Sequence, residues 1–446
     1  MWLIVVLVAW AARPDLLGVT SFVRASFLQE ANYHLLVHFF HSNALVLPWL
    51  LTAWVRLAMK LFQPLATSGY VVLVADGLKV AKEGKKMPGV KSLHQESTDN
   101  SKAEFIMGHS IQVIALLVGA PTGQVFAVPL LSRICEGLIW GRAHDRKTLL
   151  DKLVDMFNEV TTIAARPVVL VANAYYSSKK VIRPLNDAGH ALISRLRRNA
   201  IAYEVAPESK VRRRGRPKKY GKKIKLHNLF KTGSSFVEAP SPVYGEKNVV
   251  VKYRHVDLLW RPIGELVRFV LVKHPTRGLL ILLSSDCSLE PLEVIRLYGL
   301  RFKIEVSFKQ ALHTLAAYGY HFWMKSMKPI KIGSGDQRLN NTTLRDKGAV
   351  ARKLAAYHRY IQIGCIVQGL LLHLAINYRT KVWAQFRSWL RTMRPDLVPS
   401  EMVVAQALKE RFPQFLLHST NDAAVKKFIL ARADIERTPG LTAEAA

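Results

Sequence analysis

Val71-Val-Leu-Val-Ala-Asp76 is an uninterrupted apolar run that closes on a carboxylate. A second run of the same kind, Pro167-Val-Val-Leu-Val-Ala-Asn173, closes on an amide instead. Short runs that are apolar throughout and rich in β-branched residues are typical of central strands in a sheet that is covered on both faces. The sequence therefore predicts two buried strands, each of which presents a polar side chain, Asp76 or Asn173, at its end.

Further strands and helices are predicted around these two runs. They follow one another as three strands, a helix, a strand, a helix and a strand, at 71–75, 111–118, 125–130, 146–160, 168–172, 177–188 and 190–196. Asp145 is placed to cap the first of these helices. This order is known from ribonuclease H-like folds, and it favours a mixed α/β sheet with flanking helices.

Outside this region the pattern of apolar and charged residues changes along the chain, which predicts several segments. We expect a helical N-terminal region at 1–65, a ribonuclease H-like core in two parts at 66–197 and 287–330, a basic loop with a β-rich insertion at 198–286, and a helical C-terminal region at 331–446. The second part of the core is predicted to hold one helix that begins near residue 288 or 289 and carries Glu305.

The charge of the chain points to a nucleic-acid partner. Lys and Arg number 64 against 32 Asp and Glu, a formal net charge of +32, which attracts a polyanion. The densest stretch runs from Arg212 to Lys223, and its Gly-Arg-Pro centre is similar to an AT-hook. Either minor-groove insertion or simple neutralisation of phosphates fits this run, and a solvated loop is the structural alternative. Its candidate DNA contacts are Arg212, Arg213, Arg214, Arg216, Lys218 and Lys219.

Cysteine and hydropathy patterns favour a protein of the reducing cytoplasm. Cys135, Cys287 and Cys365 are odd in number and widely spaced, which argues against a disulfide framework or a thiolate zinc site. Residues 1–12 are apolar but lack the basic start of a signal peptide, and 360–378 is interrupted by polar residues. Both segments are predicted to be buried helices, with a membrane anchor at 1–12 as the alternative.

Asp76 and Glu305 have the chemistry of a metal-dependent nuclease. In-line cleavage of a phosphodiester uses two hard cations about 4 Å apart, which carboxylates from distant segments can hold. Along the predicted helix, Tyr298, Arg301, Glu305 and Lys309 lie on roughly one face, where Arg301 would grip a phosphate. The ordinary alternatives are a turn or cap role for Asp76 and a surface ion pair for Glu305.

Several motifs occur in an order that resembles one known family. They are Asp76-Gly-Leu-Lys-Val80, Glu83-Gly-Lys-Lys-Met-Pro-Gly-Val90, Leu93-His-Gln-Glu-Ser97, Gly108-His109, Asn173-Ala-Tyr-Tyr176, Arg214-Gly-Arg-Pro-Lys-Lys219 and the stretch from Tyr298 to Trp323. In this order they resemble bacterial insertion-sequence transposases of the DDE type, in the branch with a Tyr-Arg-Glu-Lys signature. The resemblance covers the chain from about Arg13 to Trp323.

The resemblance implies an activity, a site and partners. Members of the family cut at transposon ends and join the freed 3′-hydroxyl to target DNA with two Mg²⁺ ions, for which Mn²⁺ can substitute. Asp76, position 173 and Glu305 would be the catalytic metal ligands, and Tyr298, Arg301 and Lys309 would contact DNA. A homodimer on terminal inverted repeats and target DNA, in the bacterial cytoplasm at the nucleoid, is also implied. Family members carry more helical sequence ahead of the stretch similar to Arg13 onward, so 1–65 is expected to be a truncated DNA-binding domain.

Two departures from the family pattern bear on activity. The second aspartate of the family is Asn173 here, and Leu312 stands where the family has a lysine, with Lys309 the nearest basic residue. Losing a negative charge from a site for two divalent ions weakens their binding, so we expect little or no cleavage. Asp187 and Asp286 are not expected to substitute. Two hypotheses follow: a transposase impaired at Asn173, or a transposase-derived DNA-binding protein without catalysis.

The remaining candidate residues are expected to be structural. No pair among His94, His109 and His144 has a recognised metal spacing, so no zinc site is predicted. Three aromatic residues could contact DNA but are predicted to pack in the core, namely Tyr175, Tyr176 and Trp323.

Overall fold

The computed structural model describes residues 1–436 apart from 14, 96–102, 142–146, 208–217, 232–234, 389–392, 419–422 and 435. The chain forms two compact units. Unit 1 consists of Met1–Gln63, Gly77–Arg146 and Val306–Ala446, and unit 2 consists of Pro64–Asp76 and Lys147–Glu305. The division falls within strand β3 (Tyr70–Ala81) and within helix α8 (Lys303–His313). These units are defined by contacts in space, whereas the segments expected from the sequence are defined by changes of pattern along the chain. The sequence segments therefore stay a prediction.

Three parallel strands lie at the centre of unit 2. They are β3, β8 (Val168–Ala172) and β9 (Ala191–Arg195), with β8 between the other two. Val71 to Ala75 of β3 pair in register with Val168 to Ala172 of β8, and every residue of β8 is buried. The apolar run at 168–172 therefore forms the central strand that its composition predicts. Helix α6 (Lys179–Asp187) joins β8 to β9, as a crossover between parallel strands requires.

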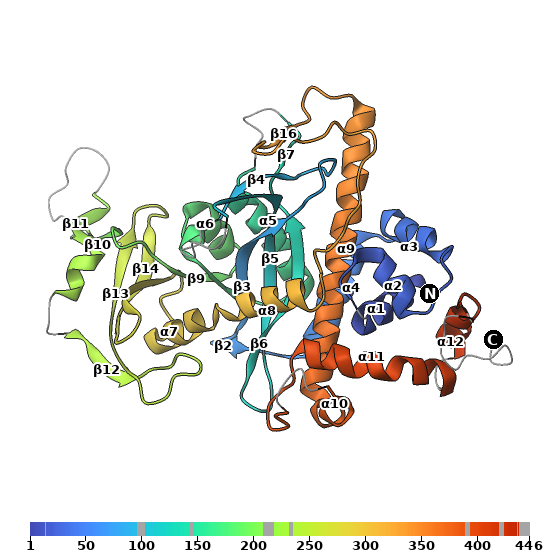
Figure 1. Ribbon diagram of the computed structural model, residues 1–446. Coiled ribbons are helices and arrows are strands. Elements are labelled where there is room, and N and C mark those ends of the chain that lie inside the picture. The colour runs from blue at the N-terminus through green and yellow to red at the C-terminus, as the bar shows by residue number, and fades with distance from the viewer. Residues whose placement is uncertain are drawn as a thin grey trace. The chain divides into compact units, whose positions relative to one another are not determined.

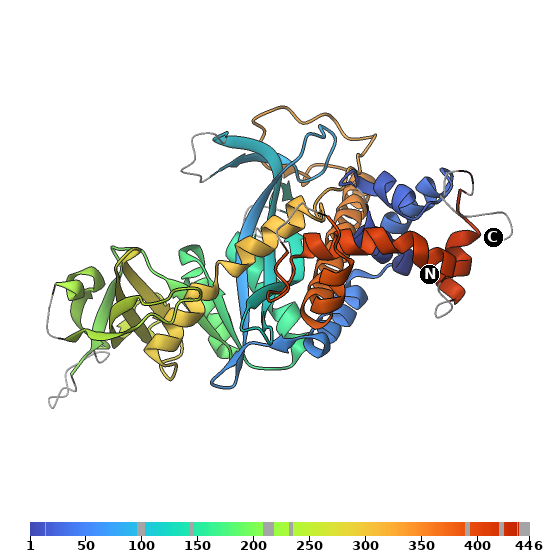
Figure 2. The same ribbon diagram turned by 60° about the horizontal axis from the view of Figure 1, so that its bottom comes forward.

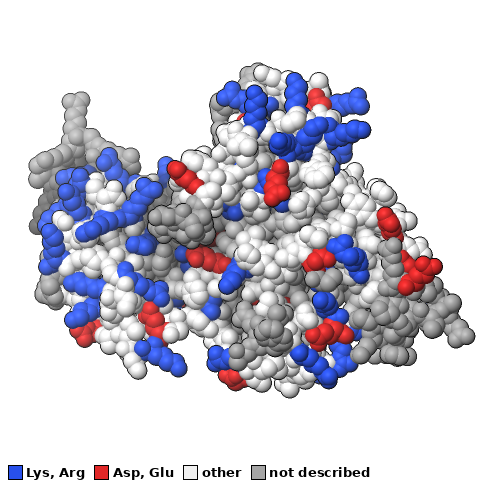
Figure 3. All heavy atoms as spheres, viewed as in Figure 1, with Lys and Arg blue, Asp and Glu red and all other residues white. Residues whose placement is uncertain are grey.

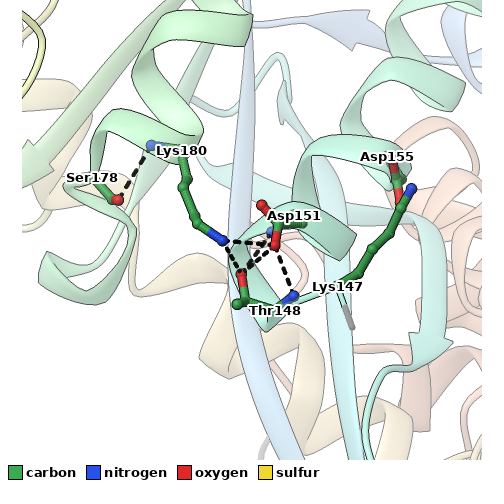
Figure 4. Close-up of polar contacts among 6 residues, drawn as sticks. All are labelled: Lys147, Thr148, Asp151, Asp155, Ser178 and Lys180. Carbon is green, nitrogen blue, oxygen red and sulfur yellow. Dashed lines mark hydrogen bonds and ion pairs between the residues drawn. The ribbon is translucent and has the colours of Figure 1, made fainter. Parts of the chain in front are cut away.

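A capping box starts helix α5 (Leu149–Ala164) and ties it to α6 (Figure 4). The Thr148 amide donates to Asp151 Oδ2 (2.7 Å), and the Asp151 amide donates to Thr148 Oγ1 (3.4 Å). Lys180 Nζ at the start of α6 donates to the same Asp151 oxygen (2.9 Å). The predicted start at residue 146 is wrong, because this box fixes the first turn at Leu149; Asp145 and Arg146 lie outside the described residues.

The β-rich segment extends this sheet within unit 2 (Figures 1 and 2, green to yellow). Its strands are β10 (Ile201–Val205), β11 (Tyr220–Lys225), β12 (Val237–Pro240), β13 (Val250–Trp260), β14 (Glu265–His274) and β15 (Gly278–Ser284). All their pairings are antiparallel, and β15 pairs with β9 through Leu282 and Arg195. Helix α7 (Pro291–Leu300) packs against β9 and β15. The predicted insertion therefore continues the central sheet.

The segment that carries Glu305 is two helices rather than the one predicted. Helix α7 begins at Pro291, a residue suited to the first turn, and ends at Leu300, and α8 begins at Lys303. Between them the hydrogen bonds tighten to a spacing of three residues, from Ile304 N to Arg301 O (3.2 Å) and from Glu305 N to Phe302 O (3.0 Å). The prediction of one continuous helix is wrong because this tight turn interrupts it.

Unit 1 combines helices with an antiparallel hairpin. Strands β5 (Phe105–Gly119) and β6 (Val125–Ile134) pair from Ile111 and Ile134 to Gly119 and Val125, and contain the predicted strands at 111–118 and 125–130. The N-terminal helices are α1 (Trp2–Ala12), α2 (Gly18–Ala25), α3 (Asn32–His41) and α4 (Leu47–Leu61), and the C-terminal ones are α9 (Leu344–Asn377), α10 (Arg379–Gln385), α11 (Glu401–His418) and α12 (Ala423–Leu430). The short strands β4 (Lys91–His94), β7 (Leu138–Ile139) and β16 (Gln337–Arg338) complete this unit.

The two apolar segments form helices that pack inside unit 1. Val5, Val6, Ala9 and Trp10 of α1 are buried. Among the described residues one helix, α9, is long and apolar enough to span a membrane, but 72% of its apolar window is buried in the protein. Its buried polar groups have partners there, since Gln362 Nε2 donates to Leu130 O at 2.9 Å. The prediction of buried helices is confirmed.

The predicted fold class is confirmed. The main elements follow the chain as β3, β5, β6, α5, β8, α6 and β9, in a mixed α/β architecture with flanking helices. This order is consistent with a ribonuclease H-like fold.

Candidate active site

Asp76 and Asn173 lie side by side in unit 2. The parallel pairing of β3 with β8 ends at Ala75 and Ala172, and these two polar residues come next. Asn173 Nδ2 donates to Asp76 Oδ1 at 2.8 Å. Asp76 does not close β3 as predicted, because the strand continues to Ala81, but it is the first residue beyond the pairing with β8. Strand register therefore brings the two predicted site residues into contact.

The Asn173 side chain has a fixed orientation. Its Oδ1 accepts a hydrogen bond from the Tyr175 amide (2.9 Å) and so caps the short 3-10 helix η2 (Ala174–Tyr176). Its backbone oxygen accepts from Ser194 Oγ of β9 (2.8 Å). Because asparagine and aspartate cap helices equally well, the local fold is compatible with either residue. The amide oxygen serves the backbone, so the NH₂ group faces Asp76.

Arg301 joins the two carboxylates of the site. Its Nη1 lies 2.6 Å from Asp76 Oδ2, and its Nη2 lies 2.8 Å from Glu305 Oε1. The Arg301 and Asp76 side chains are only 20% and 14% exposed, whereas Glu305 is 56% exposed. Burial opposes the charge of Arg301, but the carboxylates of Asp76 and Glu305 outweigh it and raise the pKa of the guanidinium. Burial also raises the pKa of the neighbouring Tyr298 phenol.

This donor set does not fit two divalent cations. Mg²⁺ takes oxygen ligands, and a pair of ions needs several carboxylate oxygens. Here one Asp76 oxygen accepts from an amide NH₂, the other contacts a guanidinium, and the amide oxygen of Asn173 faces the backbone. Within the described part of the chain, no group of three His, Cys, Asp or Glu side chains is arranged to hold a metal ion. Arg301 instead supplies positive charge between the carboxylates.

Residues 138–316 match the family described as Transposase DDE domain. This stretch, which is less than half of the chain, is therefore similar to a DDE-type transposase domain. It includes Asn173, Arg301 and Glu305, while Asp76 precedes it. No curated protein gives a significant match to the chain.

Other residues predicted for a transposase site are exposed or lie outside the described residues. Lys218 and Lys219 are exposed in unit 2, and Lys309 is exposed on the part of α8 that belongs to unit 1. Arg212, Arg213, Arg214 and Arg216 lie outside the described residues.

The two rejected aspartates have ordinary surroundings. Asp286 accepts hydrogen bonds from Tyr70 Oη (2.9 Å) and the Ser288 amide (2.8 Å). Asp187 is exposed at the end of α6. Neither contacts Asp76, Asn173 or Glu305 in any hydrogen bond found among the described residues.

The aromatic predictions hold only in part. Tyr176 is buried at 3% exposure, but Tyr175 is 51% and Trp323 is 63% exposed. Core packing is therefore wrong for Tyr175 and Trp323. Tyr175 belongs to the one-turn helix η2, which is too short to bury both adjacent rings against the sheet. His109 is buried, with its ring nitrogens 2.6 Å from Tyr320 Oη and 3.0 Å from Pro88 O, while His144 lies outside the described residues.

A basic pocket in unit 2 was missed by sequence reasoning. The cavity measures about 430 Å³ and is lined by Lys179 and Arg183 of α6, Lys219, and Arg261 of the turn between β13 and β14. Lys179 and Arg183 carry a further sequence signal, since two cations four residues apart share one helix face. Lys219 was predicted as a DNA contact, but its neighbours in the pocket come from distant segments.

Proposed function

We propose that this chain is a DDE-type transposase whose strand-cleaving centre is impaired at Asn173. One observation carries the proposal: two neighbouring parallel strands set an amide against Asp76 at 2.8 Å, in a chain that matches the transposase DDE domain. A family member would hold a second carboxylate there. Replacing it with an amide removes one negative charge from the site that must attract two divalent ions.

The finer features of this function are proposals as well. DNA is the substrate that the family implies, and the formal net charge of +32 supports a polyanionic partner. The family activity that this chain descends from would take place in the bacterial cytoplasm, on a homodimer that pairs terminal inverted repeats and joins them to target DNA. The present donor set does not fit a pair of divalent ions. With aspartate restored at position 173, Asp76, residue 173 and Glu305 would be the ligands of the two Mg²⁺ or Mn²⁺ ions that the family's chemistry uses.

A cleavage assay on a restored site tests the proposal. The Asn173→Asp variant and the wild type are incubated with transposon-end DNA and Mg²⁺ or Mn²⁺, and nicking and strand transfer are measured. We expect background cleavage from the wild type and metal-dependent cleavage from the variant. Asn158→Asp, an exposed change of the same charge on α5, is the control and should stay at background. Efficient cutting by the wild type would contradict the impairment.

Metal-dependent stability gives a second measurement that does not need activity. The Asn173→Asp substitution would set a second carboxylate beside that of Asp76, and a bound cation would relieve the repulsion between the two. We therefore expect Mg²⁺ to raise the thermal midpoint of Asn173→Asp and to leave the wild type and Asn158→Asp unchanged. An equal response of all three proteins would show that residue 173 does not control the binding of metal.

A second candidate function is DNA binding without catalysis. The observation that favours it is Arg301, which already neutralises Asp76 and Glu305. If Asn173→Asp is folded, binds DNA and still does not cut, the loss is wider than one ligand and this second function is supported.

A further inference from the structure

We infer that the basic pocket of unit 2, lined by Lys179, Arg183, Lys219 and Arg261, holds a phosphate of the DNA backbone. This inference rests on the proposed function for the identity of the partner, and adds to it a binding site away from Asp76, Asn173 and Glu305.

Three chain segments build the pocket. Lys179 and Arg183 lie one turn apart on α6, and Lys219 precedes β11. Arg261 and Gly264 belong to the turn between β13 and β14, which closes with a hydrogen bond from Gly264 N to Trp260 O (2.8 Å). A helix therefore positions Lys179 and Arg183, and a tight turn positions Arg261. Lys219 directly precedes β11, and its backbone oxygen accepts a hydrogen bond from Ala206 N (3.2 Å).

Gly264 keeps the turn close to the opposite wall. Its φ of +76° lies in the left-handed region, and a Cβ at this position would lie 3.4 Å from both Lys219 Nζ and Tyr220 Oη. The Tyr220 ring is held against Tyr203, with 5.3 Å between ring centroids. A phenol hydroxyl thus lies among the cations, and it can donate a hydrogen bond to a phosphate oxygen.

The positive charges of the pocket are not neutralised by the described part of the protein. None of Lys179, Arg183, Lys219 and Arg261 forms an ion pair among the described residues, and the pocket lining includes no acidic side chain. The hydrogen bond that Arg183 Nη2 donates among the described residues goes to the Ile263 carbonyl (3.3 Å). Glu265, the residue after the turn, accepts from Asn186 Nδ2 instead (3.5 Å).

Lys180 shows the contrast within the same helix. Its Nζ donates to Asp151 Oδ2 at 2.9 Å and to Thr148 Oγ1 at 3.3 Å (Figure 4). The fold therefore neutralises Lys180 and leaves the adjacent Lys179 and the three cations around it without a counter-ion among the described residues. Like charges held together repel, and a bound anion reverses that cost.

The surroundings favour a polyanion over a small phosphate compound. Exposed Lys222, Lys223 and Lys225 continue along β11 beyond the pocket. Figure 3 shows Lys and Arg gathered over the surface of β10, β11 and β13, with few acidic groups among them. A linear series of phosphates can contact the pocket and this surface together, which a single phosphate cannot do. We therefore assign the pocket to double-stranded DNA.

Salt-dependent DNA binding tests the inference. Affinity for a duplex is measured by fluorescence anisotropy over a series of NaCl concentrations for the wild type, Lys179→Ala/Arg261→Ala and a control, Lys180→Ala/Lys247→Ala. Both double variants remove two positive charges from unit 2, but the control residues do not line the pocket. Losing two of the four cations that hold this phosphate should weaken binding and lower the slope of log Kd against log salt by about 1, the value for one phosphate. The control should keep the wild-type slope.

Lysine footprinting locates the contact directly. Acetylation by an N-hydroxysuccinimide ester, read by mass spectrometry, should be slowed by DNA at Lys179 and Lys219 and not at Lys180 or Lys247. If the wild type binds DNA but the two double variants behave alike, or Lys179 and Lys219 stay fully reactive, the pocket inference is wrong while the proposed function stands. If the wild type binds no DNA, both fail. Pocket-dependent binding to anionic lipid vesicles in place of DNA would also overturn the assignment.

Discussion

Two charged clusters of unit 2 differ in whether their cations have carboxylate partners. In the Asp76 cluster the guanidinium of Arg301 is mostly buried and paired with two carboxylates at 2.6 and 2.8 Å. In the basic pocket, Lys179, Arg183, Lys219 and Arg261 have no carboxylate partner among the described residues. Cation and carboxylates neutralise one another in the first cluster, whereas the cations of the second would be neutralised by an anion from outside the protein. If the pocket binds DNA as inferred above, the protein keeps a contact for DNA while the guanidinium of Arg301 occupies its candidate metal site.

Removing Arg301 should have the largest effect on stability. Arg301→Ala removes the guanidinium that lies 2.6 Å from the Asp76 carboxylate, whose side chain is 14% exposed, and breaking a buried pair from one side is strongly unfavourable. We expect a loss of about 2–4 kcal/mol, seen as a lower urea midpoint, after allowing for the partial exposure of the cluster. Arg277→Ala, which breaks a pair at the 48%-exposed Arg277 side chain, is the matched control and should cost under about 1 kcal/mol. Equal losses would show that Arg301 contributes no more than a surface ion pair.

Another cation, Lys82 of unit 1, is buried with no carboxylate partner among the described residues, and it should make stability depend on pH. Its Nζ donates to the carbonyls of Tyr318 and Tyr320 and lies 3.8 Å from the Tyr320 ring centroid. Burial lowers the pKa of Lys82 to about 7. Below that pH the folded state bears the full cost of a buried charge. As the pH rises towards 10.5, the pKa in the unfolded chain, the folded state alone loses the proton and gains stability.

Lys82→Met removes this titration. The stability of the wild type relative to Lys82→Met should rise by on the order of 1 kcal/mol per pH unit above neutrality. Urea midpoints at pH 7 and pH 9 measure the change. Lys79→Met is the control. In the wild type, the exposed Lys79 donates to His94 O at 2.6 Å, so the stability difference between this variant and the wild type should be the same at pH 7 and pH 9. A pH-independent difference for Lys82→Met would contradict the assigned pKa.

The contact between Asp76 and Asn173 can be predicted from the sequence, but the position of Arg301 beside Asp76 cannot. Two apolar runs predict two buried strands, and parallel register then sets their next residues side by side. Which way the Asn173 amide turns depends on the Tyr175 amide and Ser194, and the place of Arg301 depends on the tight turn between α7 and α8. No proline marks that turn, so the helical pattern runs through it. Such choices are made by tertiary contacts that a local pattern does not contain.

The basic pocket could not be predicted from the sequence for the same reason. Lys179, Lys219 and Arg261 come from three segments, and only the twisted sheet of β10–β14 brings the last two near α6. Composition and charge runs located Lys219 but not its neighbours. Exposure of Trp323 was equally invisible, because an aromatic residue beyond a helix carries no pattern that separates core from surface.

The Asp151 contacts offer a smaller test of how the fold neutralises Lys180. Burial works against the shift, but hydrogen bonds from Thr148 and Lys180 outweigh it and lower the pKa of Asp151 to about 2 from its ordinary 3.8. The stability contribution is therefore present above pH 4 and is lost as the pH falls towards 2. Asp151→Ala should cost about 1 kcal/mol at pH 7, since it removes a capping box, and less at pH 3. If Asp151→Ala costs the same free energy of unfolding at pH 7 and pH 3, the ionised form of Asp151 contributes nothing beyond its capping role.

The smallest stability effect should come from the pocket itself. Lys179→Ala/Arg261→Ala removes two exposed cations that have no ion pair among the described residues, so we expect the free energy of unfolding to change by less than about 0.5 kcal/mol. Inorganic phosphate at constant ionic strength should raise the thermal midpoint of the wild type more than that of this variant, because only the wild type keeps the full set of cations. Lys180→Ala/Lys247→Ala should respond to phosphate like the wild type. An equal response of all three proteins would mean that the pocket does not concentrate phosphate, and the contrast with the Arg301 cluster would lose its functional meaning.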